Sequence, residues 1–214
     1  MDKKVIILDF DGTVYSGEHK FDNVPKAIEE NRRKFFPRIT DNEYNMLLTE
    51  FPEFLNVTSG RKITLAMWKM KDKFPQLDID TKDFFDWQNN SRYEIVLDPT
   101  LIADIDYINN LAINHPTYIV SNSSPNHLLY YMEVLGLNPK LFKDIVSNQF
   151  LQSDPSKEHH YKDILDKENC KPSQFYVFGD SVEADLIPAQ NLGMNTIYID
   201  NATLLKNEIE KVLK

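Results

Sequence analysis

Acidic side chains gather directly after two apolar runs of the sequence. They are Asp9 and Asp11 after Val5–Leu8, and Asp180 and Asp185 after Phe175–Phe178. Carboxylates that are packed together repel one another unless a cation lies between them. Oxygen ligands without a His or Cys cluster favour Mg²⁺ over Zn²⁺. We therefore expect one Mg²⁺ site, although solvated strand caps and, for Asp185, compensation of a helix N-terminus are alternative interpretations.

Two further segments carry groups that suit a phosphate. Ser121 and Asn122 follow the apolar run Thr117–Val120, and a hydroxyl with exposed backbone N–H groups can bind phosphate oxygens there. Lys157 lies in a loop before a helical pattern and could neutralise the same oxygens. Ser and Asn also cap helices, and a single lysine is commonly only solvated, so each residue alone permits either interpretation.

Five short apolar runs are predicted to be the strands that position these residues. They are Lys4–Leu8, Thr117–Val120, Asp144–Val146, Phe175–Phe178 and Thr196–Ile199. Each is rich in Val, Ile, Tyr or Phe and lacks polar alternation, which is typical of strands buried on both faces of a parallel sheet. Ligands bind at the carboxyl ends of such strands, where the polar residues described above are found.

Helical patterns separate the later strands. They cover Leu101–Asn114, Pro125–Leu135, Glu158–Glu168, Val182–Asn191 and Leu204–Leu213. Strands that alternate with helices predict an α/β fold, with a Rossmann-like parallel sheet. The first two strands, however, are too far apart in the sequence for a simple crossover.

Residues 15–98 are predicted to form an inserted, all-helical domain, and residues 1–14 with 99–214 form the α/β core. Asn23-Val24-Pro25 opens one helix, and Thr40 with Glu43 makes a capping-box pattern for a second. Two more helices fit Ile63–Lys71 and Lys82–Tyr93. The pattern indicates about four helices and no strand in this segment.

These segments together resemble the haloacid-dehalogenase-like (HAD) superfamily of phosphohydrolases. The pentad DFDGT at 9–13 matches the family's first motif, YIVSNS the second and GDSVEADLIPAQNLGM the fourth. LGLNPKLFKDIVS is also similar to the family's link between its second and third strands, and the insert stands where the family has its helical C1 cap. The third motif departs from the family, because Lys157 is followed by Glu158 where proline is usual. Lys162 is therefore the alternative lysine.

The resemblance implies a role for each site residue. Asp9 would be the nucleophile that forms an aspartyl-phosphate, and Asp11 the general acid and then the base. Mg²⁺ would be held by Asp9, the backbone carbonyl of Asp11 and Asp180. Ser121, Asn122 and Lys157 would bind the phosphate. Three further residues would hold these groups in position without contacting the substrate themselves: Thr13, Ser181 and Asp185.

The cap is expected to select the substrate. Leu55–Lys62 resembles the substrate-specificity loop of C1-capped members, with Arg61 the first choice and Lys62 the second for an anionic substrate contact. Tyr15 and Glu18 follow the first motif and are expected near the entrance. An ordinary exposed helix start is the alternative interpretation of Arg61 and Lys62.

The implied activity is Mg²⁺-dependent hydrolysis of a small phosphorylated metabolite. A phosphomutase has the same core motifs and remains an alternative, as does a non-catalytic protein that binds a metal or phospho-ligand. The dehalogenase branch lacks the second acid, so Asp11 argues against it. A signalling receiver domain also has clustered acids, but the helical insert and the Gly-Asp-Ser element argue against that fold.

Composition narrows the expected partners and location. The 214 residues carry a net charge of −9, with a pI near 5.0, which disfavours nucleic-acid polymers and membrane surfaces. Cys170 is the single cysteine, so an intrachain disulfide is impossible. Only four apolar residues follow Lys4 before Asp9, too few for a signal peptide. We expect a soluble, cytoplasmic monomer or homodimer.

Overall fold

The computed structural model describes residues 3–17, 19–20, 24–55, 60–90, 94–147 and 156–214. The chain divides into two compact units, which we call the α/β unit (Met1–Gly17 with Leu97–Lys214) and the helical unit (Glu18–Val96). The predicted boundaries, after 14 and after 98, differ from these by only a few residues. None of the described helices is both long enough and apolar enough to cross a membrane.

A five-stranded, fully parallel sheet forms the centre of the α/β unit, which confirms the predicted fold class. Its strands are β1 (Val5–Leu8), β4 (Thr117–Ser121), β5 (Asp144–Ser147), β6 (Phe175–Gly179) and β7 (Asn195–Tyr198). Their order across the sheet is β5-β4-β1-β6-β7. Every residue of β1 is completely buried, which explains why this strand reads as an uninterrupted apolar run.

The strand register brings the chemistry-bearing residues to one edge of the sheet. Leu8 is the partner of Ile119 in β4 and of Phe178 in β6. Because these strands are parallel and in step, the residues that follow each of them leave the sheet on the same side. Asp9, Ser121 and Asp180 therefore emerge close together from three adjacent strands.

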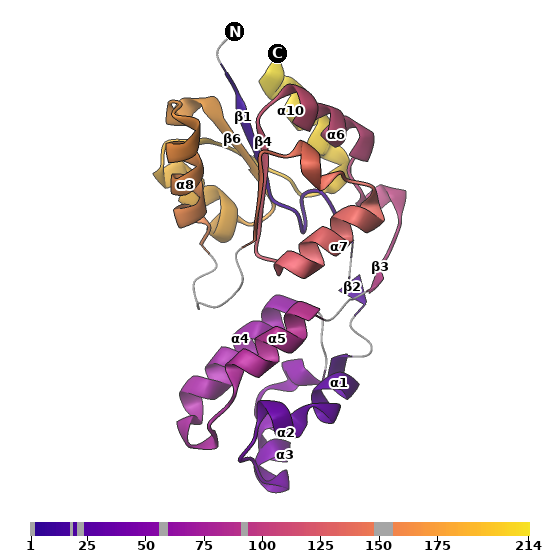
Figure 1. Cartoon of the computed structure of the whole chain (residues 1–214), viewed down its shortest axis with the longest axis vertical. Coiled ribbons are helices and arrows are strands. Elements are labelled where there is room, and N and C mark those ends of the chain that lie inside the picture. The colour runs from indigo at the N-terminus through magenta and orange to yellow at the C-terminus, as the bar shows by residue number, and fades with distance from the viewer. Residues whose placement is uncertain (1–2, 18, 21–23, 56–59, 91–93, 148–155) are drawn as a thin grey trace. The chain divides into compact units, whose positions relative to one another are not determined.

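Helices cover both faces of this sheet. They are α6 (Ile105–Asn114), α7 (Pro125–Leu135), α8 (Glu158–Glu168), α9 (Ile187–Asn191) and α10 (Leu205–Leu213). On one face, Tyr161 and Ile164 of α8 pack with Val5 and Ile7 of β1, whereas α6 and α10 lie on the opposite side of the sheet (Figure 1). The apolar faces of the helices thus bury the sheet between two layers.

The predicted helix over Val182–Asn191 is present with these bounds, but it is not α-helical throughout. A π-helical segment, η6 (Val182–Leu186), directly precedes α9. Pro188 lies in the first turn of α9 and has no N–H to continue a regular hydrogen-bond ladder from the preceding turn.

Short 3₁₀ turns complete the described chain. They are η1 (Pro52–Phe54), η2 (Pro75–Leu77), η3 (Pro99–Leu101), η4 (Pro139–Leu141), η5 (Pro172–Gln174) and η7 (Ala202–Leu204). Five of the six begin with proline, whose fixed φ suits a first-turn position. The predicted helix over Leu101–Asn114 begins later than expected, because Asp104 caps α6 by accepting a hydrogen bond from the Tyr107 N–H at 3.0 Å.

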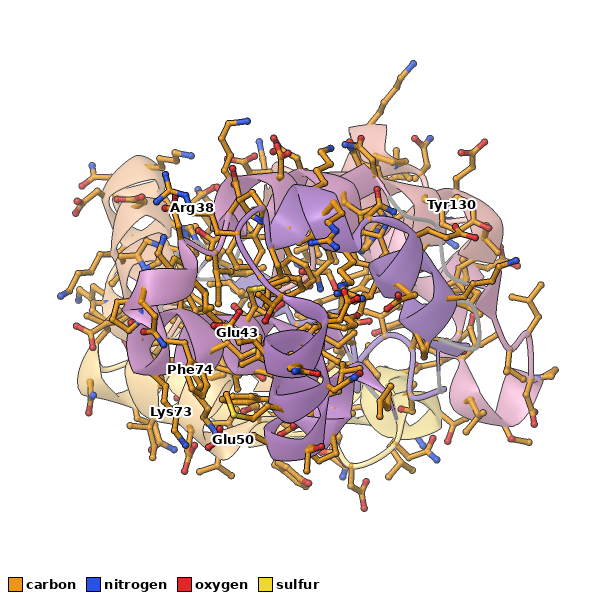
Figure 2. All side chains as sticks on the ribbon, turned by 90° about the horizontal axis from the view of Figure 1, so that it is seen from below. Arg38, Glu43, Glu50, Lys73, Phe74 and Tyr130 are labelled. Atoms are coloured by element: carbon orange, nitrogen blue, oxygen red, sulfur yellow. The ribbon has the colours of Figure 1, made fainter. Side chains whose placement is uncertain are left out.

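The helical unit is built from helices around an aromatic core. They are α1 (Val24–Glu30), α2 (Arg32–Phe35), α3 (Asp41–Glu50), α4 (Gly60–Lys73) and α5 (Thr81–Asn90). The predicted capping box is present, since Thr40 Oγ1 accepts from the Glu43 N–H and Glu43 Oε2 accepts from the Thr40 N–H. Lys73 of α4 pairs with Glu50 of α3, and its Nζ lies 5.7 Å from the centre of the Phe74 ring (all three are labelled in Figure 2).

The expectation that the insert contains no strand is wrong. Two short strands, β2 (His19–Lys20) and β3 (Glu94–Ile95), pair antiparallel within the helical unit. They come from opposite ends of the insert and contain two residues each. A two-residue strand has no periodicity of its own, so sequence patterning could not reveal it.

Candidate active site

Asp9 is anchored at the end of the central strand. Its backbone N–H donates to the Phe178 carbonyl at 2.9 Å, which extends the pairing of β1 with β6 by one residue. The residue is buried, and both carboxylate oxygens have partners: Lys157 Nζ donates to Oδ1 at 2.6 Å and Thr13 Oγ1 donates to Oδ2 at 3.2 Å. The carboxylate is therefore held in one orientation at the sheet edge.

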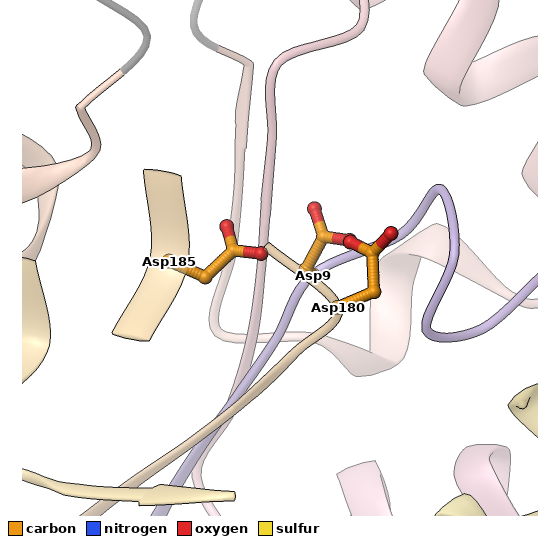
Figure 3. A group of neighbouring side chains, drawn as sticks. All are labelled: Asp9, Asp180 and Asp185. Atoms are coloured by element: carbon orange, nitrogen blue, oxygen red, sulfur yellow. The ribbon is translucent and has the colours of Figure 1, made fainter. Parts of the chain in front are cut away.

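Asp180 and Asp185 complete a cluster of three carboxylates with Asp9. One oxygen from each lies within 4.8 Å of the other two (Figure 3). Asp9 and Asp185 are buried, while Asp180 reaches solvent. Oxygens bound to one Mg²⁺ at about 2.0–2.1 Å lie roughly 3–4 Å from each other, so small side-chain movements would let Asp9 and Asp180 share an ion. Both oxygens of Asp185 are already engaged, by Lys157 Nζ and by the Ser181 N–H. An all-oxygen donor set of this kind fits Mg²⁺.

Lys157 is the cation that the structure places among these acids. Its Nζ lies 2.6 Å from Asp9 Oδ1 and 2.5 Å from Asp185 Oδ1, and its side chain is 1% exposed. Lys162, the alternative suggested by the unusual third motif, is on the surface of α8 and pairs with Glu158 at 2.6 Å. The lysine at the site is therefore Lys157.

The backbone of Lys157 is held by the interrupted helix that carries Asp185. The Lys157 N–H donates to the carbonyl of Ala184 at 3.2 Å. In a regular α-helix the N–H of residue 188 would bond to that carbonyl, but Pro188 has no N–H to donate. The proline thus removes a competitor for the carbonyl that fixes the position of Lys157.

Gly12 allows Asp180 to approach the first motif. Its φ is +91°, a conformation that favours glycine. A Cβ atom at this position would stand 2.1 Å from Asp180 Oδ2, so the carboxylate rests where any other residue would have a side chain. The motif needs glycine here for backbone geometry and for space.

The electrostatics of the cluster follow from burial and from like charges. Burial raises the pKa of Asp9 well above its usual value, the charges of Asp185 and Asp180 raise it further, and Lys157 opposes them. Desolvation and the Asp185 charge also raise the pKa of Asp180. Burial acts to lower the pKa of Lys157, but the attraction of Asp9 and Asp185 outweighs it and the pKa is raised. The lysine stays charged, and one positive charge faces three acids.

Asp11 points to a different set of partners. Its Oδ2 accepts a hydrogen bond from Ser123 Oγ. The Ser123 N–H donates to Ser121 Oγ at 2.9 Å, and the Ser123 carbonyl accepts from Ser147 Oγ. The roles of Ser123 and Ser147 were not predicted from the sequence. Ser123 adjoins the predicted phosphate-binding pair, and Ser147 ends the strand next to it, so their positions after strands were the available signal.

The remaining predicted residues have mixed outcomes. Ser181 supports Asp185, because its backbone N–H donates to Asp185 Oδ2 at 3.0 Å. Asn122 is half-buried in the loop between β4 and α7. Glu18 lies outside the described residues, and although Arg61 and Lys62 belong to the first turn of α4, their side chains are also outside the description.

Tyr15 does not fit the expected place at an entrance. It is 1% exposed, and a Cβ on Gly17 would meet its hydroxyl at 2.2 Å. Its backbone carbonyl accepts from the Gly12 N–H at 2.7 Å, and the residue bridges to Ile102. Tyr15 is therefore a buried residue that ties the turn after the first motif to the chain segment before α6.

Solved structures with the same fold come from several organisms. A HAD phosphatase from Thermococcus onnurineus has a TM-score of 0.55 at 18% identity, over 98% of this chain and 97% of its own. A HAD-like family hydrolase from Porphyromonas gingivalis has a TM-score of 0.54 at 16% identity, over 99% and 98%. A HAD hydrolase from Bacillus subtilis bound to magnesium has a TM-score of 0.52 at 16% identity and full coverage of both chains.

The comparison of sequences gives the family. No curated protein matches this chain. The family model of the haloacid dehalogenase-like hydrolases matches residues 3–193, which include every strand of the sheet except β7 and all the acids of the cluster. The match spans both units and agrees with the parallel fold and the clustered aspartates, and this protein belongs to the haloacid dehalogenase-like hydrolases.

Proposed function

We propose that this protein is a Mg²⁺-dependent phosphatase that hydrolyses a small phosphomonoester through an aspartyl-phosphate on Asp9. The observation that carries the proposal is the cluster of Asp9, Asp180 and Asp185 around Lys157 at the carboxyl edge of the sheet. Asp11, two residues beyond the nucleophile, supplies the second acid that hydrolysis of an ester requires.

The first step replaces the substrate's phosphoester bond with an acyl-phosphate bond to Asp9. A carboxylate oxygen of Asp9 attacks phosphorus, the bond to the substrate's alkoxide oxygen breaks, and Asp11 gives that oxygen a proton. Two like charges 4 Å apart repel by about 4 kcal/mol at an effective dielectric constant of 20, which opposes the approach of a carboxylate to a phosphate. When bound, Mg²⁺ would supply positive charge against this repulsion, held by Asp9, Asp180 and the backbone carbonyl of Asp11.

The chain's own groups add to this charge neutralisation. Lys157 Nζ already lies 2.6 Å from Asp9, so its charge stands next to the attacking carboxylate. Ser121 Oγ accepts a hydrogen bond from the Ser123 N–H, which leaves the Ser121 hydroxyl proton to be donated to a phosphate oxygen. Such fixed donors favour the transition state, where charge spreads over the phosphoryl oxygens.

The second step restores Asp9. Water attacks the phosphorus of the aspartyl-phosphate, Asp11 takes up the water's proton, and inorganic phosphate leaves with the carboxylate of Asp9 regenerated. Asp11 is thus protonated at the end of the cycle and ready to act as an acid again. We further propose that Arg61, or Lys62 beside it, contacts an anionic group of the substrate remote from the phosphate.

The test is phosphate release over a panel of small phosphomonoesters, with Mg²⁺ or with EDTA. Wild type should release phosphate only with Mg²⁺, and Asp9→Asn should lose activity by several orders of magnitude because it lacks the nucleophile. Asp166→Asn, which removes one charge from the exposed surface of α8, is the matched control and should act like wild type. A folded Asp9→Asn variant that keeps more than a few per cent of activity would refute the nucleophile.

Asp11 distinguishes a phosphatase from a passive binder. Asp11→Asn should keep its kcat/KM on p-nitrophenyl phosphate, whose leaving group needs no proton, and should lose it on an alkyl phosphate. Equal losses on both substrates would contradict the acid role. A phosphomutase would instead transfer the phosphoryl group to a second sugar phosphate with little net release, which the same panel would reveal.

A further inference from the structure

Ser123 is the centre of a hydrogen-bonded network that also contains Ser121, Ser147 and Asp11. Ser147 Oγ donates to the Ser123 carbonyl, the Ser123 N–H donates to Ser121 Oγ at 2.9 Å, and Ser123 Oγ donates to Asp11 Oδ2. All four residues of this network belong to the α/β unit. The mechanism proposed above gives a direct role at the phosphoryl group to Asp9, Lys157 and Ser121. It gives no role to Ser123 or Ser147.

The hydrogen bonds of this network fix the backbone of Ser123. Both polar groups of its main chain have partners, and both partners sit on the sheet, because Ser121 and Ser147 are register neighbours at the ends of β4 and β5. A residue held at its N–H and its carbonyl has little freedom left except rotation of its own side chain. The Ser123 hydroxyl is therefore attached to a backbone that is held in place.

We infer that Ser123 is a positioning residue for Asp11, and that Ser147 contributes only through Ser123. The inference rests on the proposed function, in which Asp11 transfers protons. An acid must lie about 2.6–3.2 Å from the oxygen that it protonates, so the orientation of the Asp11 carboxylate decides whether it can deliver its proton. A hydrogen bond from a fixed hydroxyl confines Asp11, and misplacement by about 1 Å can reduce a rate by roughly a hundredfold.

The kinetic test compares two leaving groups. Since kcat/KM covers only the steps up to formation of the aspartyl-phosphate, it should fall tenfold or more for Ser123→Ala on glycerol 2-phosphate, whose alkoxide needs a proton. The same variant should keep kcat/KM within twofold on p-nitrophenyl phosphate, and inorganic phosphate should inhibit it as it inhibits wild type. Ser123→Thr, which keeps a hydroxyl, should recover most of the lost rate.

A different pattern would overturn the inference. If Ser123 bound the phosphoryl group itself, Ser123→Ala would lose kcat/KM equally on both substrates and would bind inorganic phosphate more weakly. If Ser123 were only a surface hydroxyl, neither substrate would respond. Ser173→Ala, an exposed serine of η5, controls for loss of a hydroxyl elsewhere in the α/β unit.

Ser147 is tested by a double-mutant cycle. Ser147→Ala alone should lower kcat/KM on glycerol 2-phosphate by less than Ser123→Ala does. The Ser123 hydroxyl remains in this variant, but the Ser123 backbone loses the hydrogen bond to its carbonyl. In the Ser123→Ala background, Ser147→Ala should have no further effect. Additive losses would show that Ser147 does not act through Ser123 and would overturn its part in the inference.

A structural readout separates this inference from the proposed function. Wild type that releases no phosphate with Mg²⁺ would refute the phosphatase, but it would not decide whether Ser123 holds Asp11. Crystal structures of wild type and Ser123→Ala decide that directly. The carboxylate of Asp11 should adopt a new side-chain orientation in the variant, and an unchanged orientation would overturn the positioning role whatever the activity.

Discussion

Gly12→Ala is the sharpest perturbation that the site offers, because it moves a proposed metal ligand without altering any acid. The Cβ that this change introduces would stand 2.1 Å from Asp180 Oδ2 and 2.2 Å from Asp180 Cγ. Ordinary contacts begin near 3.4 Å, so the carboxylate must move away by more than an ångström. The backbone is also strained, since the φ of +91° is unfavourable for alanine.

The two effects have different sizes and different consequences. Backbone strain at a positive φ costs roughly 1–2 kcal/mol of stability for a residue other than glycine. Displacement of Asp180 should instead weaken Mg²⁺ binding and lower turnover, by about a hundredfold if an ångström of misplacement has its usual effect. Stability alone therefore cannot report on the site, whereas Mg²⁺ affinity can.

Gly136→Ala is the matched control for backbone strain. Gly136 ends α7 with a φ of +83°, and a Cβ there would meet nothing within 4 Å. Both variants should lose similar stability in urea unfolding. Only Gly12→Ala should need more Mg²⁺ for half-maximal stabilisation against heat and for half-maximal phosphate release.

Two results would refute this reasoning. Wild-type Mg²⁺ dependence in Gly12→Ala would mean that Asp180 does not depend on the space beside Gly12, or that it is not a ligand. Equal loss of Mg²⁺ binding in Gly136→Ala would mean that general destabilisation, and not displacement of the carboxylate, is responsible.

Four further predictions follow from individual side chains. Lys157→Met should destabilise the fold by about 3–5 kcal/mol, because it leaves buried carboxylates without their cation, and an unchanged urea midpoint would contradict this. Asp180→Ala should abolish stabilisation by Mg²⁺ in thermal unfolding. Burial, and after it the charge of His159, lowers the pKa of His160 from 6.5 to about 4. Between these two pH values the unfolded chain binds a proton at His160 and the folded chain does not. Stability from this group is therefore complete above pH 6.5 and declines as the pH falls towards 4, and His160→Gln should show a smaller fall in melting temperature between pH 7.5 and 5. Arg61→Ala should lower kcat/KM tenfold to a hundredfold on the best substrate but little on p-nitrophenyl phosphate, and equal loss on both would assign Arg61 to folding.

The three central strands of the sheet, β4, β1 and β6, were predictable because their burial leaves a direct trace in the sequence. The outer strands β5 and β7 are only partly buried. Residues 5–8 are completely buried and read as an unbroken apolar run, and Asp9 ends that run in the sequence as it ends the strand in the structure. Helix ends with a local chemical cause were also predictable: Pro125 begins α7, and Gly136 with a positive φ ends it.

Features that depend on distant pairing could not be predicted. β2 and β3 contain two residues each and exist only because the two ends of the insert meet, which no local pattern encodes. Ser147 is a comparable case at the site. Its contact with the Ser123 carbonyl depends on the alignment of β4 with β5, and that register is fixed by the sheet as a whole.

The lysine of the site shows how local rules and distant contacts combine. Lys157 was identified from the sequence by its resemblance to the family's third motif, although the proline expected after it is missing. The structure supplies another proline, Pro188, whose lack of an N–H leaves the Ala184 carbonyl to the Lys157 N–H at 3.2 Å. The same turn carries Asp185, which binds the lysine's Nζ at 2.5 Å. One helical segment therefore contacts Lys157 at both its backbone N–H and its Nζ, and the same Nζ lies 2.6 Å from Asp9 Oδ1.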